Sequence, residues 1–229
     1  MFTESALPKR ILVIAAHPDD EVLGVGGTIA KYARMGNDIF ICILAEGATA
    51  RYEGKMITQL EEYASQASEI LGVKEIYFER LPDERLDQIP FIDVIKPIER
   101  RISEIKPDII FTHHRGDANT DHQIVFKATI AATRTLRGDT IKKILCYEVP
   151  SSTEQSPPFL EYAFTPNVFV DISNSLAKKL EAMRAYQSEV GEYPHPRSIE
   201  ALTVTARHWG VKVGLEAAEA FMLVREITK

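Results

Sequence analysis

The chain has 229 residues, of which 45% are hydrophobic and 26% are charged, and its formal net charge at pH 7 is −6. A chain of this length suits one α/β domain that buries roughly 70% of its unfolded surface. The excess of acids argues against nucleic acid or an anionic membrane as partner, because both require clustered Lys and Arg, but it does not exclude a small anionic substrate.

Residues 8–150 alternate β-rich runs with helical patterns. The expected strands are residues 10–16, 38–46, 75–81, 107–114 and 142–149, and the expected helices between them are residues 27–36, 56–73, 91–105 and 121–136. Pro97 is expected to kink the third of these helices. Strands that alternate with helices in this way predict a mostly parallel sheet with helices on both faces, an α/β fold.

The regularity ends after residue 150. The expected elements there are a long loop at 150–167, a strand at 168–173, a helix at 176–188, a helix near 197–209 and an amphipathic end at 214–227. Asp171 or Ser173 is in position to cap the first of these helices. Because the chain shows no internal repeat or linker-like boundary, we interpret residues 1–229 as one domain, with a core at 8–150 and a C-terminal elaboration at 151–229.

The cysteines and the apolar runs bear on the compartment. Cys42 and Cys146 lie within apolar, strand-like runs, so we expect buried reduced thiols rather than a disulfide or a metal pair. No apolar run approaches the roughly 18 residues of a membrane span, and the N-terminus lacks the hydrophobic region of a signal peptide. We therefore expect no membrane span and a cytoplasmic protein.

Two polar, histidine-bearing segments follow the first and fourth expected strands. The first contains His17, Asp19 and Asp20, and the second, residues 113–123, contains Asp117, Asn119, Asp121 and His122. In doubly wound sheets the first and fourth strands commonly lie side by side, and ligands bind in the crevice beyond their carboxyl ends. We therefore expect the two segments to meet at one switch point of the sheet.

Such a meeting would assemble a metal site. His17, Asp20 and His122 form a set of two histidines and one carboxylate, and catalytic zinc sites use three such ligands and leave a fourth position open. Water on such an ion has its pKa lowered toward about 7. Iron(II) accepts the same ligands, so the metal can be Zn²⁺ or Fe²⁺. We expect Asp19 to point in a different direction from Asp20, so that its carboxylate can accept and donate protons beside the metal.

Structural and cofactor-binding alternatives explain less of the pattern. An acid after a strand commonly caps a helix, but this explains one of the two aspartates and leaves His17 unexplained. His122 could be a solvated residue at a helix start. The run GVGGT (24–28) suggests a dinucleotide fingerprint, but Ile29 stands where its last glycine is required. Close helix–sheet packing explains Gly26 and Gly27 without a cofactor.

The hexapeptide AHPDDE after the first strand, together with DANTDH after the fourth, resembles the motifs of the PIG-L/LmbE-like family of zinc-dependent de-N-acetylases. The resemblance covers residues 10 to about 136, and PNVFVDIS (166–173) supports it less specifically. It implies a Rossmann-like fold and hydrolysis of acetamide groups, mostly on N-acetylglucosamine-type sugars. It also implies His17, Asp20 and His122 as metal ligands and Asp19 as the general base.

The chain departs from the family pattern at Asn119. Many members have a histidine there that stabilises the oxyanion, oriented by an aspartate that corresponds to Asp121. An asparagine amide can donate a hydrogen bond to an oxyanion but cannot act as a cationic acid. Either Asn119 supplies this weaker donor, or His113 or His114 reaches the site from the strand end. A purely structural alternative is that Asn119 forms an Asx turn into the helix.

Loops after strands are expected to select the substrate, because the metal chemistry is indifferent to what lies beyond the amide. The candidate segments are residues 47–55, 147–155 and 193–198, and the candidate substrate-binding residues are Arg51, Tyr147, Glu148 and Ser151. Arg51 would meet a phosphate or carboxylate, or is simply a solvated loop arginine. His195 and Arg197 either line the site or form an oligomer contact.

The predicted function is removal of an acetyl group from an N-acetylated amino sugar, which yields acetate and a free amine. The partner is a small sugar or sugar conjugate, and we expect a homo-oligomer. The alternatives are a metal-dependent hydrolase of another amide, an ester or a phosphoester, and a non-catalytic sugar-binding relative. A binding module has no need for Asp19 beside a complete ligand set, and two-metal phosphoesterases need more bridging carboxylates than these loops obviously supply.

Overall fold

The computed structural model describes residues 8–50, 55–134 and 141–228. Its seven-stranded sheet has the order β3-β2-β1-β4-β5-β7-β6. The strands are β1 (Arg10–Ala15), β2 (Asp38–Ala45), β3 (Glu75–Leu81), β4 (Ile109–His113), β5 (Lys143–Tyr147), β6 (Val168–Asp171) and β7 (Ala218–Glu226). Strands β1 to β5 run parallel to one another, whereas β7 is antiparallel to both β5 and β6. The predicted α/β fold, with a mostly parallel sheet, is confirmed.

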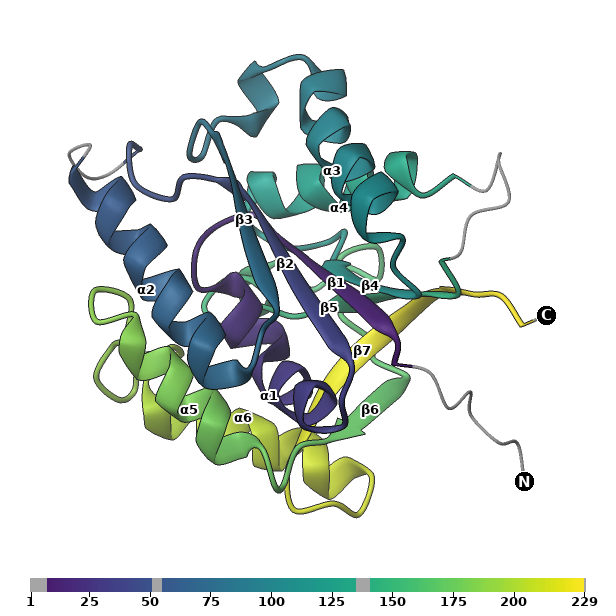
Figure 1. The fold of residues 1–229 in the computed structure, drawn as a ribbon. Helices are drawn as coiled ribbons and strands as arrows, with labels where there is room; N and C mark the ends of the chain where they lie inside the picture. Colours follow the sequence, from purple (N-terminus) through teal and green to yellow (C-terminus); the bar gives the residue numbers. More distant parts are fainter. Residues whose placement is uncertain (1–7, 51–54, 135–140, 229) are drawn as a thin grey trace.

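Helices cover both faces of this sheet. They are α1 (Asp20–Arg34), α2 (Lys55–Leu71), α3 (Phe91–Ile105), α4 (Thr120–Ala132), α5 (Leu176–Ala185) and α6 (Ile199–Lys212), with 3-10 turns η1 (Leu86–Gln88) and η2 (Thr153–Gln155). Figure 1 shows α3 and α4 on one face of the sheet and α1, α2, α5 and α6 on the other. Among the described residues, none of these helices combines the length and the apolar character that crossing a membrane requires.

Strand β1 lies in the interior of the sheet, between β2 and β4, and is buried on both faces, as its continuous apolar sequence predicts. Ile11 and Val13 pack in the core beneath α1 and α2, while the alternating Leu12 and Ile14 pack beneath α3 and α4. Cys42 and Cys146 are both buried and free, as predicted. β1 also pairs directly with β4, so the expected switch point of the sheet exists.

Helix α1 begins at Asp20, seven positions before the start expected from its periodicity. The glycine-rich run therefore lies inside the helix rather than before it. A Cβ atom on Gly27 would lie 2.8 Å from the Ile172 side chain, and one on Gly26 would lie 3.2 Å from Lys179 of α5. These glycines thus permit close packing, as expected, although part of the contact is with α5 rather than with the sheet.

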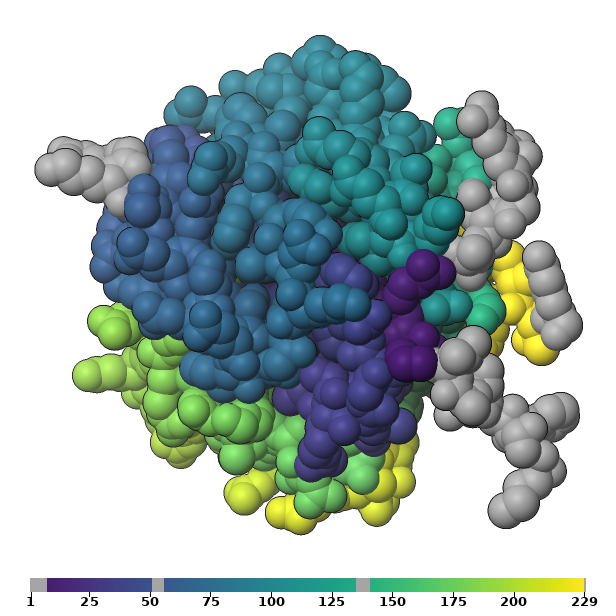
Figure 2. All heavy atoms as spheres, viewed as in Figure 1, coloured from purple at the N-terminus to yellow at the C-terminus, as the bar shows by residue number. Residues whose placement is uncertain are grey.

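The C-terminal part of the chain differs from expectation in two places. The amphipathic end contains β7, which lies between β5 and β6 in the sheet. Helix α5 follows Ser175, so neither Asp171 nor Ser173 caps it; instead Asp171 accepts a hydrogen bond from the Ser173 backbone N–H at 2.9 Å. Figure 2 shows green and yellow atoms of the C-terminal part along the lower side of the molecule and further yellow atoms at its right side.

Candidate active site

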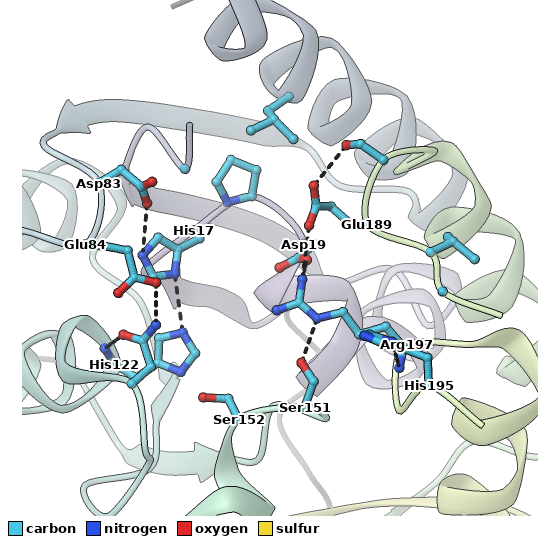
Figure 3. A pocket seen from close by; sticks show the side chains of 17 residues that line it. His17, Asp19, Asp83, Glu84, His122, Ser151, Ser152, Glu189, His195 and Arg197 are labelled. Carbon is cyan, nitrogen blue, oxygen red and sulfur yellow. Dashed lines mark hydrogen bonds and ion pairs between the residues drawn. The ribbon is translucent and has the colours of Figure 1, made fainter. Parts of the chain in front are cut away.

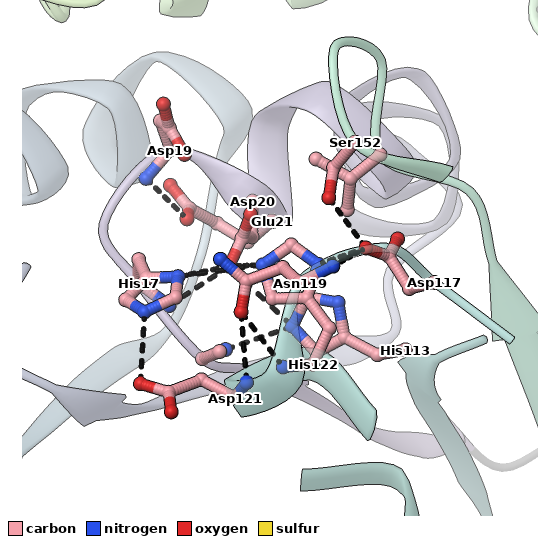
Figure 4. A network of polar contacts seen from close by, with 12 residues as sticks. His17, Asp19, Asp20, Glu21, His113, Asp117, Asn119, Asp121, His122 and Ser152 are labelled. Carbon is pink, nitrogen blue, oxygen red and sulfur yellow. Dashed lines mark hydrogen bonds and ion pairs between the residues drawn. The ribbon is translucent and has the colours of Figure 1, made fainter. Parts of the chain in front are cut away.

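The candidate site lies where β1 and β4 end. His17 follows β1, Asp20 opens α1, and His122 lies in the first turn of α4. Because parallel neighbours β1 and β4 have their carboxyl ends at the same edge of the sheet, the two loops meet there, as the sequence predicts. Figure 4 shows the three side chains directed toward one another.

The three side chains are spaced as ligands of one ion. His17 Nδ1 lies 3.5 Å from Asp20 Oδ2, His122 Nε2 lies 3.4 Å from the same oxygen, and the two nitrogens are 3.3 Å apart. In a tetrahedral zinc site with bonds of about 2.0–2.1 Å, ligand atoms are separated by about 3.3 Å. The residues present therefore fit a small divalent ion, and these are the residues that form a candidate metal cluster in the described part of the chain.

The second ring nitrogen of each candidate histidine ligand lies close to a carboxylate. His17 Nε2 lies 3.3 Å from Asp121 Oδ2 and 3.5 Å from Asp83 Oδ1, and His122 Nδ1 lies 3.2 Å from Asp117 Oδ1. Burial lowers the pKa of His122, but Asp20 and Asp117 outweigh burial and raise it to about 9. The surroundings thus stabilise positive charge at this point, and carboxylates in such positions also fix the orientation of ligating imidazoles.

Asp117 is itself held firmly. Its carboxylate accepts hydrogen bonds from the hydroxyls of Ser152 and Thr153 and from the backbone N–H of Asn119, the last at 2.9 Å. Burial raises the pKa of Asp117, but His122 and the two hydroxyls lower it to about 2. It therefore stays ionised behind His122.

Neither His113 nor His114 lines the pocket. His113 is fully buried, its Nε2 accepts a hydrogen bond from the Ala16 N–H at 2.8 Å, and its ring stacks on His122 with centroids 4.0 Å apart. Burial lowers the pKa of His113 to about 4. His114 Nε2 lies 2.9 Å from the Tyr162 carbonyl oxygen. His113 packs behind the site, with its Nε2 3.4 Å from Asp20 Oδ2, and His114 contacts Tyr162 instead, so the expectation that either one reaches in from the strand end is not met.

Asn119 forms the Asx turn that the structural alternative predicts. It is the N-cap of α4, and its Oδ1 accepts hydrogen bonds from the backbone N–H of Asp121 at 2.8 Å and of His122 at 3.3 Å. Its Nδ2 donates to Glu84 Oε1 at 3.0 Å. The side chain also lines the pocket, so a capping role does not remove it from the site.

Asp121 does not orient the side chain of residue 119. Its Oδ1 accepts a hydrogen bond from the Leu86 N–H at 3.1 Å, and its Oδ2 faces His17 Nε2. This corrects the relation that the family resemblance implies, because with asparagine at position 119 the carboxylate supports a candidate metal ligand instead.

Asp19 lies beside the three candidate ligands in a strained conformation. Its φ of 108° is left-handed, a region that L-residues other than glycine rarely occupy and that clusters at functional sites. The residue is 2% exposed, and burial raises the pKa of Asp19 above its ordinary value while Arg197 opposes that rise. Asp19 Oδ2 accepts a hydrogen bond from Arg197 Nη1 at 2.5 Å.

These groups open onto a pocket of about 480 Å³, a size typical of small-molecule sites. Of the residues singled out from the sequence, those that line it are His17, Asp19, Asn119, His122, Ser151, His195 and Arg197 (Figure 3). Asp20 and Asp121 are buried behind them. His195 and Arg197 thus line the pocket, which is the first of the two possibilities that the sequence leaves open.

Two of the predicted substrate-binding residues, Tyr147 and Glu148, do not line this pocket. Tyr147 is fully buried, and its hydroxyl donates to the Ile14 carbonyl oxygen at 2.8 Å. The carboxylate of Glu148 accepts a hydrogen bond from the Trp209 indole N–H in a separate small cavity. The predictions for Tyr147 and Glu148 are therefore corrected, because the end of β5 turns these side chains into the protein. Arg51 lies outside the described residues.

Several residues that line the pocket lie outside the segments identified from the sequence, chiefly Asp83, Glu84 and Glu189. Asp83 and Glu84 follow β3, so the rule that parallel strands end at one edge could have identified them. Glu189 lies between α5 and α6 in a segment without periodicity, and no comparable signal marks it.

Comparisons with known proteins bear on this arrangement. Residues 12–133 match the profile of the PIG-L family, described as GlcNAc-PI de-N-acetylase. The diacetylchitobiose deacetylase of Thermococcus kodakarensis is 28% identical over 228 residues, which cover 94% of this chain and 83% of that protein. The uncharacterized deacetylase YaiS of Escherichia coli K12 is 31% identical over 186 residues, which cover 79% of this chain and 91% of that protein.

A solved structure shows the same fold. The N,N'-diacetylchitobiose deacetylase of Pyrococcus horikoshii matches with a TM-score of 0.76 at 24% identity, over 95% of this chain and 84% of that chain. The family profile spans more than half of the chain, and it includes both segments that build the candidate site. As the AHPDDE and DANTDH motifs predict, the chain belongs to the PIG-L family of GlcNAc-PI de-N-acetylases.

Proposed function

We propose that this protein is a zinc-dependent hydrolase that removes the acetyl group from an N-acetylglucosamine-type sugar and releases acetate and a free amine. The observation that carries the proposal is the set of three donor atoms, 3.3–3.5 Å apart, with the Asp19 carboxylate beside them at the base of a pocket. A sugar-binding module would not need a buried, strained carboxylate next to a complete ligand set.

His17, Asp20 and His122 would hold the metal, with Asp121 and Asp117 behind the two imidazoles. When bound, a divalent ion there polarises the amide carbonyl and makes an attacking water acidic near neutral pH. Zn²⁺ suits this donor set, and Fe²⁺ has compatible preferences. Only one such cluster occurs in the described part of the chain, which disfavours a two-metal phosphoesterase.

Asp19 acts as the general base in this proposal. Its carboxylate accepts a proton from the attacking water and returns it to the amine nitrogen as the carbon–nitrogen bond breaks. Its raised pKa brings proton acceptance and proton donation closer in energy near neutral pH.

Asn119 supplies a hydrogen-bond donor to the developing oxyanion. A primary amide carries two N–H bonds on Nδ2, and Glu84 engages one of them. The second is then available to a substrate in the pocket, while Oδ1 keeps its capping role. Ser151, Ser152, Asp83 and Glu84 provide polar partners for sugar hydroxyl groups at the pocket wall.

The proposal is tested by measuring acetate release from a panel of N-acetylated amino sugars. The panel contains N-acetylglucosamine, diacetylchitobiose and N-acetylglucosamine conjugates with a neutral or an anionic carrier. Zinc-loaded protein should release acetate from at least one member, and chelator-treated protein should not until zinc is restored. Equal release with and without metal would contradict a metal-dependent reaction. Homo-oligomer formation stays a prediction.

A further inference from the structure

Arg197 reaches the pocket from the segment between α5 and α6, far in sequence from the residues of the β1 and β4 loops. Its Nη1 donates to Asp19 Oδ2 at 2.5 Å and to Glu189 Oε2 at 3.2 Å, and its Nε donates to Ser151 Oγ at 2.7 Å. The guanidinium is therefore fixed by three groups from three parts of the chain, and Figure 3 shows it lying across the pocket against Asp19.

The carboxylate of Asp19 needs such a partner to have one orientation. The torsion that sets the plane of a carboxylate is broad, so the side chain alone does not hold that plane in one orientation. Within the described part of the chain, the hydrogen bond to Asp19 that involves its carboxylate is the one from Arg197, and it engages Oδ2. Among the described residues, Oδ1 of Asp19 takes part in no hydrogen bond, and Asp19 lines the pocket.

Apart from Arg197, the charged groups that act on the Asp19 carboxylate are acidic. Asp20 and Glu21 follow it in the chain, and Glu189 lies against the same guanidinium. Glu21 Oε2 accepts a hydrogen bond from the Asp19 backbone N–H at 3.1 Å, so it fixes the backbone and not the carboxylate. Arg197 is therefore the cation that opposes the repulsion between the Asp19 carboxylate and these acids.

We propose that Arg197 is a positioning residue for the reaction: it holds Asp19 by Oδ2 so that Oδ1 accepts and returns the proton. This inference rests on the proposed function, because it assigns the proton transfer to Asp19. Arginine suits the task better than lysine, since its planar fork contacts Asp19 and Ser151 with different nitrogens at once. A lysine at 197 would keep the charge but lose the second contact.

The first test compares Arg197→Ala and Arg197→Lys with Arg207→Ala, which removes an exposed arginine of α6 outside the pocket. Arg197→Ala should lower kcat by about 10- to 100-fold, the effect expected of a misplaced catalytic group, with KM changed little. Arg197→Lys should lie between wild type and Arg197→Ala. Millimolar guanidinium should restore part of the kcat of Arg197→Ala. Metal content and melting temperature are measured on the same preparations.

A double-mutant cycle separates positioning from a structural role. If Arg197 acts through Asp19, adding Arg197→Ala to Asp19→Asn should cause no further loss of kcat. Independent, additive losses in the double variant would overturn the proposal. So would a normal kcat per folded, metal-loaded molecule of Arg197→Ala.

A crystal structure of Arg197→Ala decides the matter without any activity measurement. The proposal expects the Asp19 carboxylate to rotate or to occupy more than one orientation. An unchanged, single orientation would overturn the positioning role even if the enzyme is active. Conversely, wild-type protein that releases no acetate from any sugar would overturn the proposed function, while the orientation of Asp19 still decides the role of Arg197.

Discussion

Two clusters of buried charged groups border helix α1, and they differ in where their polar atoms point. Midway along the helix, the Lys179 ammonium donates to Glu219 Oε1 at 2.6 Å and to the Leu23 carbonyl oxygen at 2.8 Å. The two Glu219 oxygens accept from the backbone N–H groups of Gly27 and Thr28, at 2.9 and 2.7 Å. In a regular helix the Gly27 N–H donates to the Leu23 carbonyl. Lys179 and Glu219 therefore contact two backbone groups of the same helical turn.

At the N-terminus of α1 the arrangement is the opposite. His17, Asp20 and His122 direct two imidazole nitrogens and a carboxylate oxygen at one point, with nitrogen 3.3 Å from nitrogen. The Lys179–Glu219 pair contains its own cation and anion, whereas this group directs three potential metal-ligand atoms at one point. Buried charged groups that pair with one another have a structural role. Buried polar groups that all point at one position indicate a ligand there.

The largest expected effect comes from removing one of the three candidate metal ligands. His122→Ala should reduce metal binding and should bring acetate release down to the rate without enzyme. Added zinc should raise the melting temperature of the wild type, because binding to the folded state alone stabilises it, but not that of His122→Ala. Metal content by elemental analysis and thermal unfolding check both. A variant that keeps stoichiometric zinc would remove His122 from the ligand set.

The next effect concerns the proton carrier beside the metal. Asp19→Asn should retain the metal but lose kcat by about 10²–10⁴-fold, the usual contribution of general acid–base catalysis, because an amide cannot accept the proton. Turnover per metal-loaded molecule is the quantity to measure. Near-normal turnover would assign the base elsewhere, with Glu21 as the first candidate because it is buried and its pKa is raised to about 7.

Substitution in the Lys179–Glu219 pair should change the stability of the fold rather than the rate of the reaction. Lys179→Met leaves the buried Glu219 carboxylate without its cation, which typically costs about 3–5 kcal/mol of folding free energy. The matched control is Lys178→Met, because Lys178 is an exposed neighbour on α5 paired with Glu181, and its loss should change stability by no more than about 0.5 kcal/mol. Chemical denaturation measures both. Equal effects of the two substitutions would contradict the structural role of the pair.

The smallest effects are expected at Asn119, which both caps helix α4 and lines the pocket. Asn119→Ala removes the N-cap of α4 and should cost about 1 kcal/mol of stability, as well as lowering kcat by up to about 10²-fold. Asn119→Ser keeps a capping oxygen but has no amide N–H, so it should keep the stability and still lose turnover. Asn119→His, which restores the common family residue, should be tolerated. If Asn119→Ser has normal turnover, the residue is only a cap.

The sequence predicted the part of the site that depends on local order. His17, Asp20 and His122 were identifiable because each follows a strand of a parallel sheet, and the pairing of β1 with β4 brings their loops together. Arg197 and Glu189 were not assigned roles because their segment has no periodicity. Their positions depend on the packing of α5 and α6 and on Tyr186, which is fully buried and donates a hydrogen bond to Glu21 at 2.5 Å.

Two elements show where local patterns mislead. The segment AEAFMLVRE is rich in alanine and glutamate, yet it forms β7 because it fills the space between β5 and β6. Tyr147 ends a strand, a position that usually faces a ligand. Its ring is nevertheless buried against His113, with centroids 4.8 Å apart. In both cases long-range packing overrides what the neighbouring residues favour.

The central claim is tested most directly by locating the metal. Anomalous diffraction at the zinc edge, on crystals of zinc-loaded protein, should show one ion bound by His17 Nδ1, Asp20 Oδ2 and His122 Nε2 at about 2.0–2.2 Å. The same experiment on Lys178→Met should give the same peak, and on His122→Ala it should give none. An ion bound elsewhere, or no ion in the wild type at any zinc loading, would contradict the account.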